Sequence, residues 1–293
     1  MLILSEMLKR SNWSLIGVPD HLGVLNVGGR IGAALGPSAF RKAFRRLQPA
    51  SRVRVCLTDS GDVPIQGSDL PLNLKNAANQ IAAAHLLTGL SVVVGGGHDH
   101  GYSHLLGINQ ALSSKKRKLK LGCINIDAHL DVRRPDPLIT SGSPFYLALE
   151  AEVLEPNQLI EFGIQSHCNA DALWVFVKEN KVPVVPLSRL RLNATKEFKK
   201  ALNSLKKKCD AVVVSFDLDA VAAAFSPGVS APQAEGFSPS DIIQMMEISG
   251  EEKKVVSLGI FELNPIHDIG DRTALLAATA AFHFIEKALE RKN

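Results

Sequence analysis

The sequence predicts a single α/β domain over residues 1–293, built on a mostly parallel β-sheet. Apolar, β-rich runs alternate along the chain with segments of helical pattern, an order that produces parallel strands joined by helices. Several of these runs are apolar throughout instead of alternating, as expected for strands that are covered on both faces. No linker-like stretch and no internal repeat divides the chain, so we expect one domain.

The expected strands are the apolar runs at residues 13–18, 52–57, 91–94, 119–126, 159–164, 182–187, 211–216 and 255–261. After the first run, residues 37–47 place Phe40, Phe44 and Leu47 on one helical face, behind a proline that suits the first turn of a helix. Three further segments have the same pattern and are expected to form helices: residues 74–87, 238–248 and 272–289.

Composition excludes several classes of protein. The hydrophobic fraction of 46% and the charged fraction of 21% are ordinary for a globular protein, which argues against disorder. No apolar stretch approaches the roughly 20 residues of a membrane span, and the first residues lack the order of a secretory signal. The four cysteines are scattered and form no CxxC pair: Cys56, Cys123, Cys168 and Cys209. This pattern indicates reduced thiols, so we expect a cytoplasmic protein.

Charge gives no sign of a nucleic-acid partner. The net charge of +4 is modest. The basic runs at residues 115–120 (KKRKLK) and 206–208 lack interleaved aromatic residues and are expected to be solvated loops or helix ends. We therefore expect a small-molecule substrate, with neither a nucleic acid nor a membrane as partner.

Six potential metal ligands follow three of the expected strands. They are His98, then Asp127, His129 and Asp131, then Asp217 and Asp219. In extended backbone, side chains two residues apart point the same way, roughly 6 to 7 Å apart. The carboxyl ends of parallel strands are also where ligands bind in α/β sheets. Carboxylates with a minority of imidazoles suit a divalent ion such as Mn²⁺, and no cysteine is among the six.

The alternative for a lone DxH or DxD pattern is a helix cap or an ion pair with Arg133 or Arg134. Here, however, a mostly carboxylate set follows strongly apolar strands, and a buried uncompensated charge is very costly. Two divalent ions would neutralise it. Such a pair, about 3.5 to 4 Å apart, can lower the pKa of a water held between them and direct it at an electrophilic carbon. The sequence therefore indicates a hydrolase.

The triplet Gly95, Gly96 and Gly97 has neither GxGxxG spacing nor a following Lys-Ser or Lys-Thr, so we interpret it as a tight turn that brings His98 close to the ions.

Four segments resemble, in order, the signature segments of the ureohydrolase family, which includes arginase and agmatinase: GGGHDHG, NIDAHLDVR, SFDLDAV and GIFELNP. The resemblance runs from about Gly17 to near the C-terminus. It implies a three-layer α/β/α fold with an eight-stranded sheet, two Mn²⁺ ions per subunit, and assembly as a homo-oligomer, either a trimer or a hexamer.

The resemblance also implies two ligand sets. Carried across by position, one ion would be held by His98, Asp127, Asp131 and Asp217. The other would be held by His129 and Asp219 together with Asp127 and Asp217, which would bridge the two ions.

Within the family, the chain is most similar to the formimidoylglutamases, on the segments GVPDHLGVLNVGGRIGAALGP, SGSPF and SPGVSAPQAEGF. Ser141 stands where agmatinase-like members have a histidine, and Ala222–Ala224 stand where arginase-like members have Asp-Pro. Both differences disfavour arginine and agmatine as substrates. Asp99 differs from the glutamate expected after the metal-ligating histidine.

The resemblance implies hydrolysis of N-formimidoyl-L-glutamate to L-glutamate and formamide. Glu262 would form a charge-assisted hydrogen bond to the cationic amidine, and Asp131 would move a proton to the departing nitrogen. Arg133 would bind a substrate carboxylate, although an ion pair with Asp136 is the alternative. Weaker substrate-binding candidates lie on loops at the same end of the sheet: Ser141, Ser143, Asn26 and Arg30.

Two alternatives to this function remain open. One is a guanidino-acid hydrolase that releases urea, since only the pocket would differ. The other is a catalytically silent paralogue that binds metal for structure or regulation.

Overall fold

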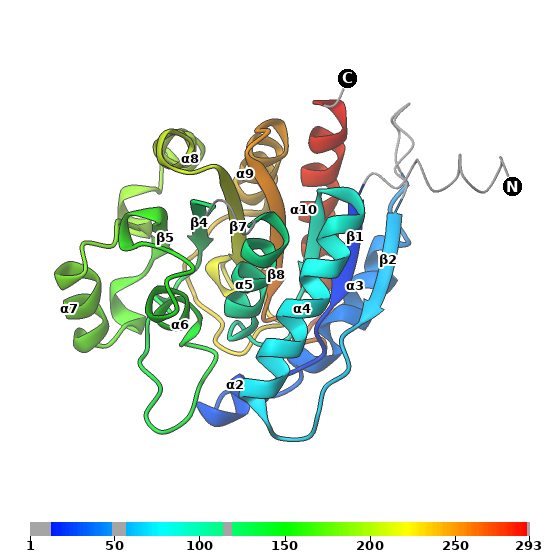
Figure 1. The fold of residues 1–293 in the computed structure, drawn as a ribbon, viewed down its shortest axis with the longest axis horizontal. Helices are drawn as coiled ribbons and strands as arrows, with labels where there is room; N and C mark the ends of the chain where they lie inside the picture. The colour runs from blue at the N-terminus through cyan, green and yellow to red at the C-terminus, as the bar shows by residue number, and fades with distance from the viewer. Residues whose placement is uncertain (1–12, 49–56, 114–118, 292–293) are drawn as a thin grey trace, which may run out of the picture.

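The structure is a computed structural model, and it describes residues 13–48, 57–113 and 119–291. One eight-stranded, fully parallel sheet forms its centre, in the strand order β2-β1-β3-β8-β7-β4-β5-β6 (Figure 1). In chain order the strands are β1 (Trp13–Gly17), β2 (Leu57–Asp62), β3 (Ser91–Val94), β4 (Leu121–Ile126), β5 (Leu159–Ile164), β6 (Val184–Pro186), β7 (Ala211–Asp217) and β8 (Val255–Phe261).

Helices cover both faces of the sheet, which confirms the three-layer α/β/α architecture. One face packs against α4 (Leu70–Thr88), α5 (His100–Leu112), α6 (Pro144–Glu150) and α7 (Asp171–Glu179). The other packs against α3 (Gly36–Phe44), α8 (Ala194–Lys208), α9 (Pro239–Glu251) and α10 (Arg272–Glu290). Short helical turns complete the connections: α2 (Leu22–Asn26) and five 3₁₀ turns, η1 (Ala33–Leu35), η2 (Pro156–Gln158), η3 (Ser166–Cys168), η4 (Leu187–Arg189) and η5 (Leu218–Ala220).

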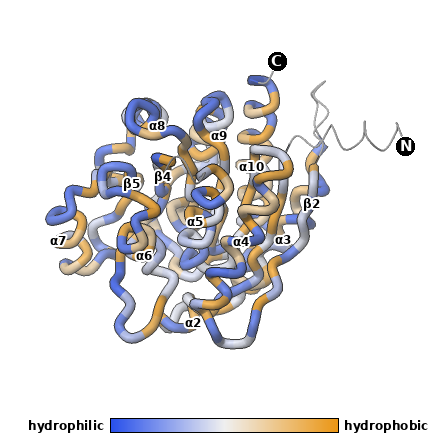
Figure 2. The backbone as a smooth tube through the Cα atoms, in the orientation of Figure 1, coloured by the Kyte–Doolittle hydropathy of each residue, from blue (hydrophilic) through white to orange (hydrophobic). Residues whose placement is uncertain are grey.

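The central strands are apolar throughout because successive side chains point to opposite faces and both faces are covered. Val92 packs into one core and Val93 into the other. Every residue of β4 and β7 is buried. Each buried Val, Leu or Ile side chain contributes about 1.5–3 kcal/mol relative to exposure. The outer helices are amphipathic; α8, largely hydrophilic in Figure 2, buries one stripe that includes Phe198 and Leu202.

The edge strand β2 differs from the prediction. The run predicted at residues 52–57 falls mostly on residues 52–56, which lie outside the described residues. The strand that the structure describes is Leu57–Asp62, a polar segment (LTDSGD) with five of its six residues exposed. Hydrophobic periodicity does not predict it because its residues are polar and mostly exposed at the sheet edge, where the strand pairs only with β1. Arg41 of α3 holds it instead, with Nε 2.9 Å from Asp59 Oδ2.

Within the described ranges, no helix combines the length and the hydropathy needed to cross a bilayer.

Candidate metal centre

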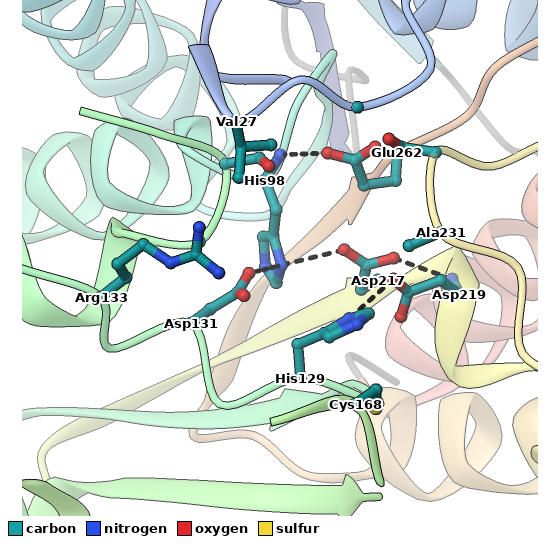
Figure 3. A pocket seen from close by; sticks show the side chains of 14 residues that line it. Val27, His98, His129, Asp131, Arg133, Cys168, Asp217, Asp219, Ala231 and Glu262 are labelled. Carbon is teal, nitrogen blue, oxygen red and sulfur yellow. Dashed lines mark hydrogen bonds and ion pairs between the residues drawn. The ribbon is translucent and has the colours of Figure 1, made fainter. Parts of the chain in front are cut away.

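The predicted ligands meet at the carboxyl ends of adjacent central strands, which lie in the order β3-β8-β7-β4. His98 follows β3, the segment from Asp127 to Asp131 follows β4, and Asp217 ends β7. Glu262 follows β8 and lies among them. Because all four strands run parallel, their ends share one edge of the sheet, and segments far apart in sequence converge there (Figure 3).

His98 lies at the centre of the first ligand group. Its Nδ1 atom lies 3.0 Å from Asp127 Oδ2, 2.9 Å from Asp131 Oδ2 and 3.0 Å from Asp217 Oδ2. Among the described residues, this buried nitrogen nevertheless has no partner with hydrogen-bond geometry. Neighbouring donors around a six-coordinate ion lie about 3.0 Å apart when each is about 2.1 Å from the ion. The donor set therefore fits a divalent cation, as predicted: His98, Asp127, Asp131 and Asp217.

The second group contains Asp127, His129 and Asp219. His129 Nδ1 lies 2.9 Å from Asp219 Oδ2 and 3.6 Å from Asp127 Oδ1. Asp219 Oδ1 is buried and lacks a hydrogen-bond partner within the described part of the chain. Asp127 is thus common to both groups. Asp217 belongs to the first group, and its Oδ1 accepts the Asp219 N–H at 2.8 Å, so its bridging role stays a prediction.

The electrostatics of the cluster call for cations. Burial raises the pKa of Asp217 well above its usual range, and the charges of Asp219 and Asp127 add to the effect. Burial likewise raises the pKa of Asp219 to about 7. Burial alone would lower the pKa of His98, but contacts with three carboxylates hold it well above the ordinary value. Without cations these acids must be protonated or paired with protonated histidine, whereas divalent ions satisfy all of them.

The two predicted catalytic acids occupy unusual backbone conformations. Asp131 has φ 45° and Glu262 has φ 65°, the left-handed region that residues other than glycine rarely adopt. Backbone hydrogen bonds keep them there: Asp131 O accepts from Phe145 N at 3.1 Å, and Glu262 N donates to Gly96 O at 2.8 Å. Strain of this kind persists where the surrounding structure fixes it, commonly at functional sites.

Several residues that the sequence analysis did not single out support the ligands. Ser215 Oγ lies 2.8 Å from His98 Nε2, so the ring nitrogen that does not face the carboxylates is also bonded. Phe261 stacks on the His98 ring, with centroids 4.9 Å apart. Asn169 donates to Ala128 O at 3.0 Å and accepts from Leu130 N at 2.8 Å. These two hydrogen bonds fix the backbone on both sides of His129.

Five of the six predicted ligands line a cavity of about 250 Å³, and the sixth, Asp127, is buried among them and does not reach its surface. We call these six ligands, together with Glu262 and Cys168, the floor. We call the remaining wall the rim; it comprises Val27, Gly29, Arg133, Ser141, Gly142, Ser230 and Ala231. Cys168 lies beside His129 at the floor, its thiol donating to Ala128 O at 3.3 Å (Figure 3). Neither Cys168 nor Ser230 was predicted to line the site.

The substrate-binding candidates fall into two groups. Arg133 and Ser141 line the cavity, and Arg133 makes no ion pair with Asp136 in the described structure. Ser143 is buried and does not line the cavity; its hydroxyl bonds to Thr140 Oγ1 at 3.2 Å. Arg30 is also outside the cavity lining, and its Nε donates to Ser230 O at 3.0 Å, which ties two rim loops together. The binding role of Ser143 stays a prediction.

Glu262 faces the cavity with one oxygen engaged and one open. Its Oε1 accepts the backbone N–H of His98 at 2.9 Å. Its Oε2 is buried, and no described residue gives it a hydrogen bond. The carboxylate is therefore fixed in orientation through Oε1 and retains a buried acceptor, Oε2, in a residue that lines the cavity (Figure 3).

The fold and the two adjoining ligand groups define a metal-dependent hydrolase built on a parallel α/β/α sandwich. A sequence model of the arginase family matches residues 11–286, and the chain belongs to that family.

Within this family, the chain is similar to proteins named formimidoylglutamase or formiminoglutamase. The chain is 31% identical to the formimidoylglutamase of Staphylococcus carnosus (strain TM300), over 94% of this chain and 87% of the relative. It is 30% identical to that of Staphylococcus aureus (strain MRSA252), over 97% and 89%. A crystal structure of Trypanosoma cruzi formiminoglutamase with Mn²⁺₂ superposes with a TM-score of 0.87 at 26% identity, covering 97% of this chain and 95% of that chain.

Proposed function

We propose that this chain hydrolyses N-formimidoyl-L-glutamate, a linear amidine, to L-glutamate and formamide, with two Mn²⁺ ions per subunit. The observation that carries the proposal is the pair of adjoining ligand groups at one cavity, with the unpartnered carboxylate oxygen of Glu262 in the same lining. Relatives of at least 30% identity, matched over nearly the whole chain, are formimidoylglutamases, which supports this substrate over a guanidino acid.

His98, Asp127, Asp131 and Asp217 would hold one ion; His129 and Asp219 would hold the other, with Asp127 shared. When bound, the ions supply Lewis-acid activation of water and neutralise the buried carboxylates. Asp131 lines the cavity beside His98, 2.9 Å from its Nδ1 atom; there it would accept a proton from the attacking water and pass it to the departing glutamate nitrogen.

Glu262 binds the amidine. Oε2 accepts a hydrogen bond from the amidinium N–H groups, which orients the electrophilic carbon toward the floor. The amidinium charge is lost as the carbon becomes tetrahedral, and a positive charge forms again when the departing nitrogen is protonated; the same carboxylate would stabilise that charge until the C–N bond breaks.

Arg133 binds the other end of the substrate. Its planar guanidinium at the rim can hold a glutamate carboxylate through two parallel hydrogen bonds, and Ser141 can add a third donor. The substrate then spans from the rim to the floor.

We further propose that the reaction serves histidine degradation in the cytoplasm and that the chain acts as a trimer or hexamer, as the family resemblance implies.

A product assay tests the proposal. Mn²⁺-loaded protein should release formamide from N-formimidoyl-L-glutamate and little urea from 4-guanidinobutyrate or agmatine, and chelator-treated protein should release neither. Urea as the main product would show that the protein is a guanidino-acid hydrolase. Tight binding of two Mn²⁺ ions without turnover of any of the three compounds would indicate a silent paralogue.

A further inference from the structure

Glu161 is an acid buried in the sheet, outside both ligand groups. It lies in the middle of β5, where all six residues are buried, and has no exposed surface. Burial raises the pKa of Glu161 well above its usual range, and the charges of Asp127 and Asp131 raise it further. In the described ranges it forms no ion pair, and its Oε1 has no hydrogen-bond partner. An apolar residue would fill this position at a lower free energy, so the acid calls for an explanation.

One contact links Glu161 to the metal centre. Asn125 of β4 is its register partner across the sheet. The Asn125 carboxamide Nδ2 donates to Glu161 Oε2 at 2.8 Å and to Asp127 Oδ2 at 3.2 Å. Asn125 is itself fully buried. No other described side chain is hydrogen-bonded to Glu161, so its one polar contact leads directly to the ligand that both groups share.

The same row of the sheet supports a second ligand. Ser215 of β7 is the register partner of Asn125 on the other side and contacts His98 Nε2 at 2.8 Å. Glu161, Asn125 and Ser215 thus form a polar layer one row below the ligands. Within that layer, Glu161 is the member that touches no ligand itself.

We propose that Glu161 is a positioning residue, which fixes the Asn125 carboxamide so that Asn125 holds the Asp127 carboxylate in the orientation that serves both ions. The Asp127 Oδ1 atom is already fixed by the backbone N–H of His129 at 2.7 Å, and the Asn125 donor completes the restraint at Oδ2. Outer partners of this kind typically change metal affinity by about 10- to 100-fold when they are removed. The inference rests on the metal centre of the proposed function.

The test is a Mn²⁺ titration of the full-length metal-free chain, by calorimetry and by the electron paramagnetic resonance signal of free Mn²⁺. Glu161→Leu removes the acceptor that orients Asn125 and should raise the Mn²⁺ Kd by about tenfold. Glu161→Gln retains an acceptor oxygen and the side-chain length, and should restore the wild-type Kd. If Glu161→Leu does not fold, Glu161→Ala carries the same test, because it removes the same acceptor without adding bulk; Asn125→Ala tests the second contact, the donor to Asp127.

A double-mutant cycle separates positioning from general stability. If Glu161 acts through Asn125, Glu161→Leu should add no further loss of Mn²⁺ affinity to Asn125→Ala. His85→Leu is the matched control, since His85 is also buried, with one side-chain partner (Ser91 Oγ, 2.9 Å) and one unpartnered nitrogen, at the opposite end of β3 from His98. It should lower the melting temperature and leave the Mn²⁺ Kd unchanged.

Two results would overturn the inference while the proposed function stands: a wild-type Mn²⁺ Kd in Glu161→Leu, or fully additive losses in the cycle. A wild-type chain that fails to bind two Mn²⁺ ions would overturn the proposed function, and the inference with it.

Discussion

The floor and the rim of the cavity are built in different ways. Apart from Cys168, which follows β5, the floor consists of side chains that directly follow four neighbouring strands, and most of them are buried: Asp127 has no exposed surface, and Asp217 has 2%. The rim consists of loops, and Arg133 is exposed. Floor residues are fixed by the sheet register and by buried contacts such as Ser215 to His98. Rim residues are held by contacts between loops. On the proposed function, the floor would carry the reaction chemistry and the rim would select the substrate.

The loops of the rim come from distant parts of the chain. Arg30 donates to Ser230 O at 3.0 Å, and Asn264 Nδ2 donates to Arg30 O at 2.8 Å. Asn26 Nδ2 donates to Ile139 O at 2.8 Å. Changes at the rim should therefore alter substrate binding and leave the ions in place, whereas changes at the metal ligands of the floor should remove the ions.

The largest effect is expected at the floor, for Asp217→Asn. Loss of this carboxylate should weaken Mn²⁺ binding by more than the roughly 100-fold loss seen for outer partners, and activity should fall with it. The metal-free variant should melt at a higher temperature than the metal-free wild type, because a buried acid beside Asp219 and Asp127 has been removed. Thermal unfolding with and without Mn²⁺ measures both. Equal Mn²⁺ stabilisation of variant and wild type would show that Asp217 is no ligand.

Glu262→Gln is expected to have the next largest effect. Glutamine keeps an acceptor for the His98 N–H but loses the charge that faces the amidinium. Hydrogen bonds to charged groups contribute about 1.5–3 kcal/mol, so kcat/KM should fall by about 10- to 100-fold. Steady-state kinetics at matched Mn²⁺ content would measure this. An unchanged kcat/KM would mean that substrate does not reach Oε2.

The floor should also titrate. Burial raises the pKa of Asp219 to about 7 in the folded state from 3.8, so its contribution to stability is complete below about pH 4 and is lost as the pH rises through about 7. The metal-free protein should thus become less stable over this window. Mn²⁺ must displace the proton, so its Kd should fall by about tenfold per pH unit up to about pH 7. Calorimetric titrations across this window measure how the Mn²⁺ Kd changes with pH. A Kd that does not change between the lower and the upper end of the window would contradict the protonation of Asp219 in the metal-free protein.

The sequence predicts the floor well and the rim poorly, for a physical reason. His98, Asp127 and Asp217 each follow an apolar run, and parallel strands bring such positions to one edge whatever the loops do. The contact between Arg30 and Ser230 depends on how two distant loops pack, which no local pattern encodes. Ser143 is an example: the sequence analysis grouped it with Ser141 as a substrate-binding candidate, but its hydroxyl is hydrogen-bonded to Thr140 within the turn.

The sequence pattern also does not predict some of the buried polar residues. In the run LIEFGI, Glu161 has the pattern of a surface residue on a half-exposed strand, and only the covering of both faces of β5 places it inside. Likewise, β2 was missed because its stability comes from pairing with β1 and from Arg41, and its polar residues carry no hydrophobic pattern.

Arg133→Met is the sharpest test of the difference between rim and floor, and has the smallest expected effect. It should raise KM for N-formimidoyl-L-glutamate by up to about tenfold with little change in kcat, because an exposed guanidinium contributes less than a buried one. The KM of Arg133→Lys should lie between those of the wild type and Arg133→Met, since an ammonium cannot form the two parallel hydrogen bonds. Arg134→Met is the matched control, because Arg134 is exposed next to Arg133 and does not line the cavity. Mn²⁺ affinity should be the same in all three variants; a loss of Mn²⁺ in Arg133→Met alone would show that rim and floor are not separable.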